Sequence, residues 1–236
     1  MANLENNETA KKKDFVEIEF LGRNLTNNEV FDTNITEEAK KIQLELSGKP
    51  LVVCIGESMV VKGFDEALEG KEIGKKYSVK ISSEKGFGKR DSKLVKMIPL
   101  KIFLAQKIYP QPGMTLALDN NLVKVISVSG GRVLVDFNNS LAGKDIEYEF
   151  TIKKIITDSK EKVSAVQRFF FGQEFEFDIE EKEGNKKIVF KDTKLAPVLN
   201  AFKDKFKEML GFDVEIFAKA EKNPEEAKKP EEIEAK

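Results

Sequence analysis

Seven residues at four places in this 236-residue sequence could line one small binding pocket. They are apolar or aromatic, with a single carboxylate among them: Phe31, Asp32, Val60, Val61, Phe64, Phe87 and Tyr148. A pocket of this composition holds little water and offers no nucleophile supported by a base. It suits a reaction that breaks no bond, and rotation about an X-Pro peptide bond is such a reaction.

The energetics of that rotation favour an apolar site. Amide resonance gives the rotation a barrier of about 18–20 kcal/mol, and the twisted transition state has lost this resonance together with its charge separation. A site with little water therefore favours the twisted state. Each tenfold gain in rate needs only about 1.4 kcal/mol of differential stabilisation. A well-shaped apolar slot can thus act without any proton transfer.

The absence of histidine narrows the chemistry further. The sequence has no histidine and one cysteine, Cys54. Ser-His, Cys-His and His-metal sites all need an imidazole, so these classes are excluded, and we expect no metal site and no cofactor. Cys54 lies in the apolar run 51–55. The sequence therefore predicts a buried strand thiol and no internal disulfide.

Composition and charge predict a globular, cytoplasmic protein. Apolar residues make up 40% of the chain, and 40 basic side chains nearly balance 41 acidic ones. With no excess of either sign, neither nucleic acid nor an anionic membrane surface is an expected partner. The sequence has no apolar run near 18 residues and does not begin like a secretory signal, so we expect no membrane span.

Hydrophobic periodicity predicts a small sheet that would position the pocket. Apolar and polar residues alternate at 16–20, 76–81 and 146–152, which is typical of strands with one buried face. Residues 64–68 carry apolar side chains four apart and stop before Gly70, which indicates one short helix. The sheet and this helix should enclose a common core.

Two further regions follow. Three alternating stretches predict a β meander inserted into the first domain, after a connector that begins at 97–100; its strands are expected at 114–118, 122–128 and 132–137. The region 160–218 predicts a compact α+β domain, with helices around 163–170 and 195–210 and strands near 174–180, 186–191 and 212–218. The polar ends, 1–13 and 219–236, are expected to be disordered.

A family resemblance rests on four motifs in combination. They are Phe31-Asp32, Val60-Val61-Lys62-Gly63-Phe64, Phe87-Gly88 and Leu141-Ala142-Gly143. With them, residues 14–156 resemble an FKBP-type peptidyl-prolyl isomerase of the SlyD-like kind, and most closely the long archaeal members that carry an additional C-terminal domain. The tail lacks the histidines and cysteines of bacterial SlyD proteins, so a nickel-handling role does not transfer.

The resemblance implies an α+β architecture. A half-barrel antiparallel sheet with one short helix would form the isomerase domain from 14–91 and 141–156. An insert-in-flap chaperone domain would occupy 92–140, and a C-terminal α+β domain 160–218. The expected activity is prolyl isomerisation of unfolded or partly folded polypeptides, which the insert would hold beside the pocket.

The resemblance also implies a role for each pocket residue. Phe64 would form the floor under the proline ring and Tyr148 the opposite wall. Val60 and Val61 match an aliphatic pair whose second backbone N–H binds a substrate carbonyl. Phe20 and Phe87 stand where many relatives have tyrosines, so two hydroxyl groups are absent and a weaker activity is expected.

The sequence also allows other interpretations of these residues and of the whole protein. Asp32 could be a strand-end carboxylate satisfied by the backbone or by Arg23, and Phe31, Phe64 and Phe87 could be simple core residues. The whole protein could be a non-catalytic holdase that binds its clients through the Phe-rich segment 169–177. That segment has more aromatic surface than a small domain readily buries, and an exposed aromatic patch usually marks an interface. Since the archaeal members that the chain resembles use their extra domain for association, the resemblance implies a C-terminal homodimer.

Overall fold

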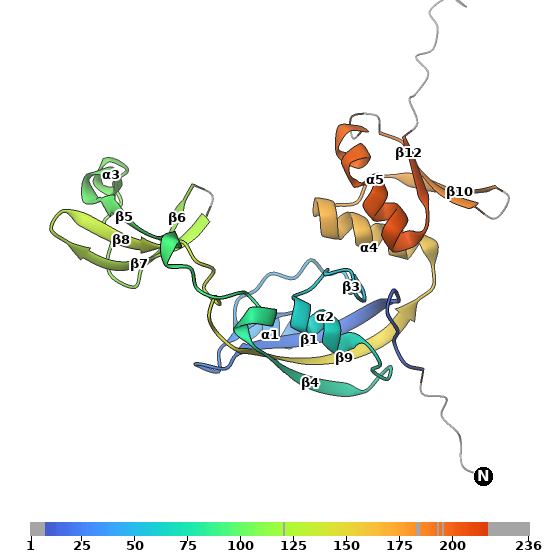
Figure 1. The fold of residues 1–236 in the computed structure, drawn as a ribbon, viewed down its shortest axis with the longest axis horizontal. Helices are drawn as coiled ribbons and strands as arrows, with labels where there is room; N and C mark the ends of the chain where they lie inside the picture. Colours follow the sequence, from blue (N-terminus) through green and yellow to red (C-terminus); the bar gives the residue numbers. More distant parts are fainter. Residues whose placement is uncertain (1–7, 120, 183–184, 193, 195, 217–236) are drawn as a thin grey trace, which may run out of the picture. The chain divides into compact units, whose positions relative to one another are not determined.

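The computed structural model describes residues 8–119, 121–182, 185–192, 194 and 196–216 (Figure 1). These residues form two compact units that divide after Ile156. The first unit contains two separate sheets with a hydrophobic core each, and the second contains one sheet and two helices. Among the described residues, no helix is long and apolar enough to cross a membrane.

The main sheet of the first unit is antiparallel and has five strands. Its strands are β1 (Phe15–Asn24), β2 (Val30–Thr33), β3 (Leu51–Cys54), β4 (Lys76–Ile81) and β9 (Ile146–Ile156). The order is β2-β1-β9-β4, and β3 pairs with β1 beyond that path. Apolar and polar residues alternate along β9, and this alternation decides which face of the strand is buried. The buried residues are Ile146, Tyr148, Phe150 and Ile152, and the residues between them are partly exposed. The predicted inward face of this strand is confirmed.

One predicted helix packs on that face. Helix α2 (Lys62–Leu68) buries Phe64 and Leu68 in the core of the sheet. Gly70 follows the helix with φ +75°, a conformation that glycine adopts without steric cost, so the helix ends where the sequence predicts. The sequence pattern did not predict helix α1 (Thr36–Lys41), which buries only Ala39, nor the 3₁₀ turn Ser83–Lys85.

The start of the chain differs from the prediction of disorder for 1–13. Thr9 forms a β-bridge with Glu72, and the Ala10 side chain is fully buried. The Ala10 N–H donates to the Lys71 carbonyl at 2.9 Å, and its carbonyl accepts from Gly70 N–H at 2.8 Å. Backbone hydrogen bonds thus order 8–13 although the segment is polar. Composition did not predict this order, because it does not report backbone pairing. Residues 1–7 and 219–236 lie outside the described part.

The insert folds as a four-stranded sheet of its own. Its strands are β5 (Val95–Pro99), β6 (Thr115–Leu118), β7 (Asn121–Ser129) and β8 (Arg132–Asp136), in the order β5-β8-β7-β6. The three expected strands are present. The segment 97–100, predicted as a connector, instead completes β5 and begins helix α3 (Leu100–Ala105), because Ile98 and Leu100 pack with Phe103 on the core of the insert.

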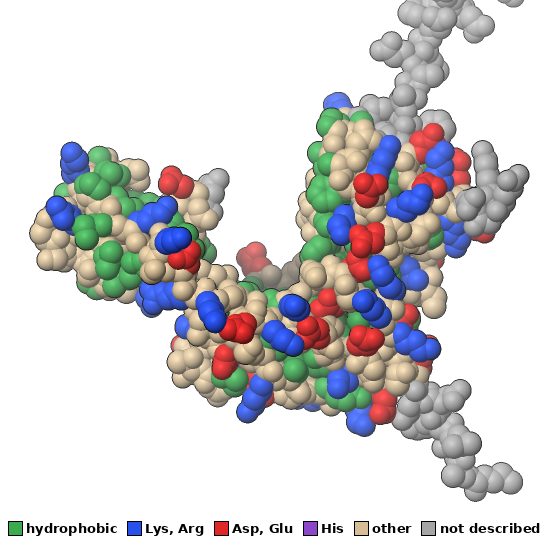
Figure 2. Space-filling model, viewed as in Figure 1, with side chains coloured by type: hydrophobic (Ala, Val, Ile, Leu, Met, Phe, Trp, Pro, Cys, Tyr) green, Lys and Arg blue, Asp and Glu red, His purple; other side chains and the backbone are tan. Residues whose placement is uncertain are grey.

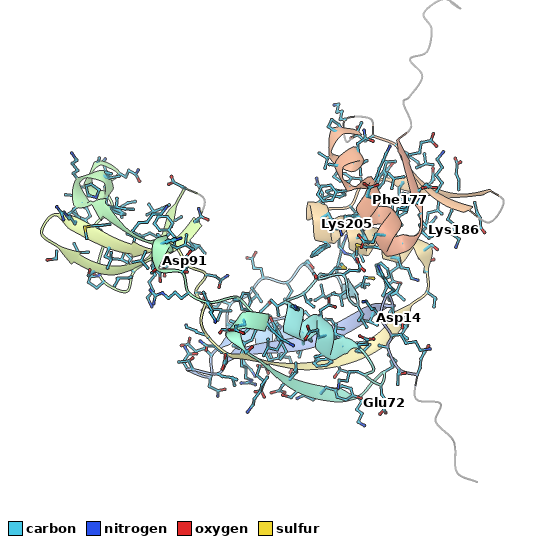
Figure 3. All side chains as sticks on the ribbon, in the orientation of Figure 1. Asp14, Glu72, Asp91, Phe177, Lys186 and Lys205 are labelled. Carbon is cyan, nitrogen blue, oxygen red and sulfur yellow. The ribbon has the colours of Figure 1, made fainter. Side chains whose placement is uncertain are left out.

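Hydrogen bonds close the base of the insert. The Asp91 N–H donates to Oδ1 of the buried Asn138 at 2.8 Å, and Asn138 Nδ2 donates back to the Asp91 carbonyl at 2.9 Å. Arg90 forms an ion pair with Asp136 beside them. Figure 3 labels Asp91 at this point, where the chain enters the insert. The two crossings of the chain are therefore bonded to each other.

The second unit packs helices α4 (Ser159–Phe171) and α5 (Ala196–Leu210) with a sheet of β10 (Phe177–Lys182), β11 (Asn185–Phe190) and β12 (Asp213–Ile216). The sheet order is β10-β11-β12, with β12 parallel to β11. The Asp158 side chain caps α4 by accepting the Glu161 N–H at 2.8 Å. Strand β10 begins at Phe177, so Phe175 precedes the strand in which the alternation predicted it.

Candidate active site

Four aromatic rings meet between the main sheet and helix α2. Phe64 from α2 stacks on Tyr148 from β9, with ring centroids 4.4 Å apart and an interplanar angle of 8°. Phe20 from β1 contacts both, at 6.0 Å from Phe64 and 5.7 Å from Tyr148. Phe150 adds an edge contact to Phe64 at 5.2 Å. These rings form the floor of the site. Tyr148, predicted as the wall opposite Phe64, instead stacks directly on it and is part of the floor.

Phe31 joins this floor to the segment after β4. Its ring meets Tyr148 edge-on at 5.7 Å and meets Phe87 edge-on at the same distance. Phe31 and Phe87 are only partly buried, whereas Phe64 and Tyr148 are 1% and 4% exposed. The exposed side of the cluster is thus formed by Phe31 and Phe87, and an apolar ring entering the site would meet these two first.

The close approach of two rings requires a glycine in β1. A Cβ atom built at Gly22 would lie 2.8 Å from Phe31 Cζ and 2.9 Å from Tyr148 Cε1. Real Cβ atoms do not come so close to ring carbons. Gly22 therefore leaves the space that both rings occupy.

The strand end that carries Phe31 and Asp32 is fixed by the residues that follow it. Thr33 Oγ1 donates to the Phe20 carbonyl at 2.7 Å. The Asn34 side chain accepts the Phe20 N–H at 2.8 Å and donates to the Ile18 carbonyl at 2.7 Å. These side-chain bonds continue the pairing with β1 past the end of β2, and so they hold Asp32 beside the aromatic floor.

Val60 and Val61 lie at the N-terminus of α2, partly buried against the same core. The Val61 carbonyl accepts from the N–H groups of Phe64 at 2.8 Å and Asp65 at 3.0 Å. The Val61 N–H, in contrast, has no hydrogen-bond partner among the described residues. It precedes the first helical residue, where backbone N–H groups have no partner within the helix. This donor is free to bind a carbonyl from outside.

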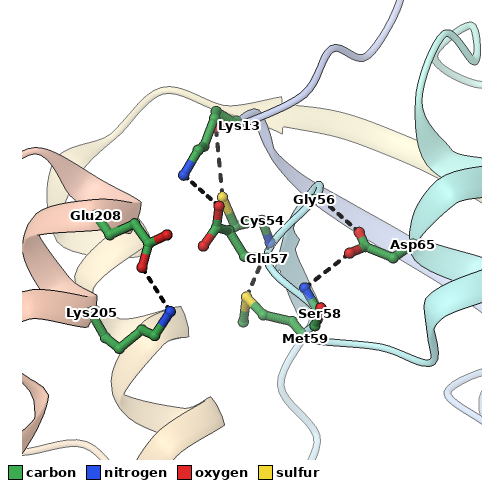
Figure 4. A network of polar contacts seen from close by, with 9 residues as sticks. All are labelled: Lys13, Cys54, Gly56, Glu57, Ser58, Met59, Asp65, Lys205 and Glu208. Carbon is green, nitrogen blue, oxygen red and sulfur yellow. Dashed lines mark hydrogen bonds and ion pairs between the residues drawn. The ribbon is translucent and has the colours of Figure 1, made fainter.

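A buried carboxylate holds the loop that carries these valines. Asp65 is 6% exposed, and its two oxygens accept the N–H groups of Gly56 at 2.8 Å and Ser58 at 2.9 Å (Figure 4). In the same loop the Met59 sulfur accepts the Cys54 N–H at 3.1 Å. Hydrogen bonds therefore join helix α2, which follows Val60, to the loop that precedes it. The Cys54 thiol is fully buried, as predicted.

The electrostatics of the site centre on Asp32. Burial raises the pKa of its carboxyl, and the neighbouring Thr33 N–H opposes this shift. Arg23 pairs with Glu149 and not with Asp32: its guanidinium Nε lies 3.7 Å from a Glu149 carboxylate oxygen. The pKa of the Tyr148 phenol is raised first by burial and then by the negative charge of Asp32. The phenol thus stays protonated and lies within the field of the carboxylate.

Comparison with known proteins agrees with this geometry. The family model described as FKBP-type peptidyl-prolyl cis-trans isomerase matches residues 6–104, and a model of the FKBP26 IF domain matches 96–141. A short-type peptidyl-prolyl cis-trans isomerase of Methanocaldococcus jannaschii is 32% identical over 148 residues, which cover 61% of this chain and 93% of the relative. The chain belongs to the FKBP-type peptidyl-prolyl cis-trans isomerase family.

Two more distant FKBP-type relatives are bacterial. SlyD of Haemophilus influenzae is 28% identical over 117 residues, or 48% of this chain and 61% of the relative. SlyD of Escherichia coli is 26% identical over 133 residues, or 55% of this chain and 67% of the relative. The predicted resemblance to SlyD-like FKBP proteins is confirmed.

The FKBP-type fold brings together all the residues that the sequence nominated. The aromatic and aliphatic ones share one core cluster, and Asp32 adjoins it through Phe31: Phe20, Phe31, Val60, Val61, Phe64, Phe87 and Tyr148. Within the described residues, no group of three His, Cys, Asp or Glu side chains could hold a metal ion.

Sequence reasoning missed three positioning residues of this FKBP-type site. They are Gly22, Asn34 and Asp65, none of which the sequence analysis singled out. Asp65 could have been recognised from the sequence, because it is an acidic residue in a short helix whose buried face also carries Phe64 and Leu68. A carboxylate in such a position needs hydrogen-bond donors nearby, because an unpaired buried charge is strongly unfavourable.

Proposed function

We propose that this chain catalyses cis-trans isomerisation of X-Pro bonds in the pocket formed by Phe31, Phe64, Phe87 and Tyr148. One observation carries the proposal: an apolar aromatic floor adjoins both a single half-buried carboxylate, Asp32, and the unpartnered Val61 N–H. Membership of the FKBP-type family supports the same activity.

Each part of the pocket has a role in the rotation. The proline ring packs on the rings of Phe31 and Phe87, and the Val61 N–H binds a carbonyl of the substrate, which fixes one side of the bond. The twisted amide is less polar than the planar one, so the apolar walls stabilise it more. Asp32 lies beside the amide, and the buried floor formed by Phe64 and Tyr148 limits access of water from below.

The activity should be moderate. Phe20 and Phe87 lack the hydroxyl groups of the tyrosines that they replace, and one hydrogen bond contributes about 0.5–1.5 kcal/mol. Each missing hydroxyl therefore costs at most about a factor of ten in rate. Loss of both does not abolish catalysis, because the apolar walls and the Val61 donor remain.

The insert supports a second role, the capture of unfolded polypeptide. Among the described residues, eight exposed large apolar side chains lie on it: Leu94, Met97, Ile102, Leu104, Tyr109, Met114, Leu122 and Ile126. Figure 2 shows hydrophobic side chains on the surface of this part of the chain. Exposed apolar surface of this extent typically marks a binding site for other proteins. The insert would raise the local concentration of clients next to the pocket.

Replacement of 92–140 by a short loop tests this division of roles. Turnover of a short prolyl peptide should be largely unchanged, because the peptide reaches the pocket without help from the insert. Catalysed refolding of a proline-limited protein should slow markedly, because the client is no longer held nearby. An equal loss on both substrates would contradict the proposal that the insert acts only by capture.

A non-catalytic holdase is the second candidate, favoured by the phenylalanines at positions 20 and 87. It would bind unfolded protein while leaving the rate of prolyl rotation unchanged. A protease-coupled assay on a prolyl tetrapeptide separates the two candidates, since only the isomerase accelerates the slow phase. The segment 169–177 is a weaker client surface than expected, because only Phe169 of its five phenylalanines is exposed.

We further propose that the chain forms a homodimer through its C-terminal unit and works in the cytoplasm. The exposed side chains of Phe169, at 43%, and Val198, at 45%, support a contact surface there. A dimer would present two pockets to one client.

A further inference from the structure

The insert has a cleft with a distinctive lining. Its volume is about 1140 Å³, and it is bordered by strand β7 and by both chain crossings at the base of the insert. Leu122 and Ile126 contribute apolar surface, with 75% and 39% of their side chains exposed. Lys124, which is also exposed, lies between them on β7. An occupant would thus contact apolar and cationic groups side by side.

The charged groups that line this insert cleft are mostly positive. Arg90, Lys124 and Lys144 line it, against one carboxylate, that of Asp136. Burial raises the pKa of Asp136, but hydrogen bonds from the Asn138 side chain and N–H, together with the ion pair with Arg90, outweigh burial and hold this pKa below its usual value. Lys124 lies opposite Asp136 in the sheet register but makes no ion pair with it.

Two positive charges therefore remain available. Neither Lys124 nor Lys144 forms an ion pair with another residue of the described chain. The insert offers Lys124 little competition, because 92–140 contains no glutamate and only two aspartates, Asp119 and Asp136. The carboxylate of Asp145, which follows Lys144, accepts the Ser83 N–H at 2.9 Å. Carboxylates of an incoming chain are the complementary partners of these lysines.

We propose that the insert cleft prefers apolar polypeptide segments flanked by acidic residues. The proposal rests on the capture role described above and specifies its client class. The apolar part of the segment contacts Leu122 and Ile126, and flanking carboxylates pair with Lys124 and Lys144. Segments flanked by lysine or arginine are disfavoured by like-charge repulsion, which gives specificity that apolar contact alone lacks.

Fluorescence anisotropy on the full chain tests the preference with three labelled peptides. They share one proline-free apolar centre, which avoids the isomerase pocket, and differ only in flanks of Glu, Ser or Lys. The Glu-flanked peptide should bind about tenfold more tightly than the Lys-flanked one at low salt. The difference should shrink in high salt, since exposed charges are then screened.

Matched variants locate the effect. The double variant Lys124→Glu/Lys144→Glu should reverse the order of the peptide affinities. The milder double variant Lys124→Gln/Lys144→Gln should abolish the preference, and it replaces the first variant in the test where the first folds poorly. Lys101→Glu changes the charge of the same domain on α3, outside the cleft, and should keep the preference. Equal binding of the three peptides, or an equal effect of Lys101→Glu, would overturn the proposal but leave the capture role intact. Failure of all three peptides to bind would refute capture itself.

Discussion

The ring of Tyr148 stacks on that of Phe64 at 4.4 Å, nearly parallel, and this contact joins strand β9 to helix α2 at the centre of the site. The stack also orients the phenol group, whose pKa is raised partly by the charge of Asp32. The floor of the site thus carries a hydroxyl group within the field of Asp32, the carboxylate of the site. This hydroxyl is present although Phe20 and Phe87 lack theirs.

Asp32→Ala should lower kcat/KM on a prolyl tetrapeptide at least about tenfold while the fold is retained. The reason is that the carboxylate borders the pocket and does not pair with Arg23, which binds Glu149 instead. A protease-coupled assay measures the rate, and circular dichroism checks the fold. Activity equal to that of the parent chain would remove Asp32 from the mechanism.

The raised pKa of Asp32 should make the stability of the protein depend on pH. The pKa of Asp32 is raised in the folded protein, so the folded state binds more protons than the unfolded state between the usual and the raised values. The free energy of unfolding therefore falls as pH rises through this window. Asp32→Asn should be more stable than the parent above the window and similar below it. Urea unfolding at several pH values measures this, and identical curves for the two proteins would contradict it.

Phe87→Tyr should raise kcat/KM, by at most about tenfold, because it restores a hydrogen-bond donor at the pocket rim. The Phe87 ring is partly buried and packs edge-on against Phe31, so its outer edge has room for a hydroxyl. Phe87→Leu is the matched control, which should lower activity by removing the ring. A fall in activity for the tyrosine variant would mean that the hydroxyl displaces the ring.

Gly22→Ala should lower both activity and stability. The new methyl group would lie within 2.9 Å of ring carbons of Phe31 and Tyr148, so at least one ring has to move. Such crowding in a packed core typically costs about 1–3 kcal/mol. Thermal unfolding and the prolyl peptide assay measure the two effects. Unchanged kcat/KM would show that the position of these rings does not limit catalysis.

Asp65→Asn should destabilise the protein by about 1.5–3 kcal/mol, because a charged acceptor of two backbone N–H groups is replaced by one oxygen and a donor. The loop bearing Val60 and Val61 should loosen, and kcat/KM should fall with it. Glu66→Gln is the control, since this exposed neighbour pairs with Lys85 at the surface. An equal response of both variants would refute the anchoring role of Asp65.

The homodimer is tested by light scattering on the full chain and on a chain ending near residue 158. We expect a dimeric mass for the first and a monomeric mass for the second. Phe169→Ser should weaken the dimer, because Phe169 is the one exposed ring of the segment 169–171. Two monomeric masses would contradict the proposal.

Much of the fold followed from local patterns. The inward face of β9, the glycine end of α2 and three strands of the insert all follow from alternation and turn residues. The segment 169–177 exposes less aromatic surface than predicted, since only the Phe169 ring is exposed. Phe170 and Phe171 both pack on Phe202 and Phe206 of α5, and sequence spacing alone does not determine such contacts.

The sequence by itself determined which side chains are candidates for the pocket, which chemistry the lack of histidine excludes, and which family the motifs indicate. Only the tertiary structure decided how these residues are held: Asn34 bonded to β1, Asp65 bonded to the loop at Gly56 and Ser58, Gly22 beneath two rings, and 8–10 paired with 70–73. The physical reason is that periodicity reports burial along one element. Hydrogen bonds and ring contacts join atoms from different elements, and their geometry exists only once those elements have packed.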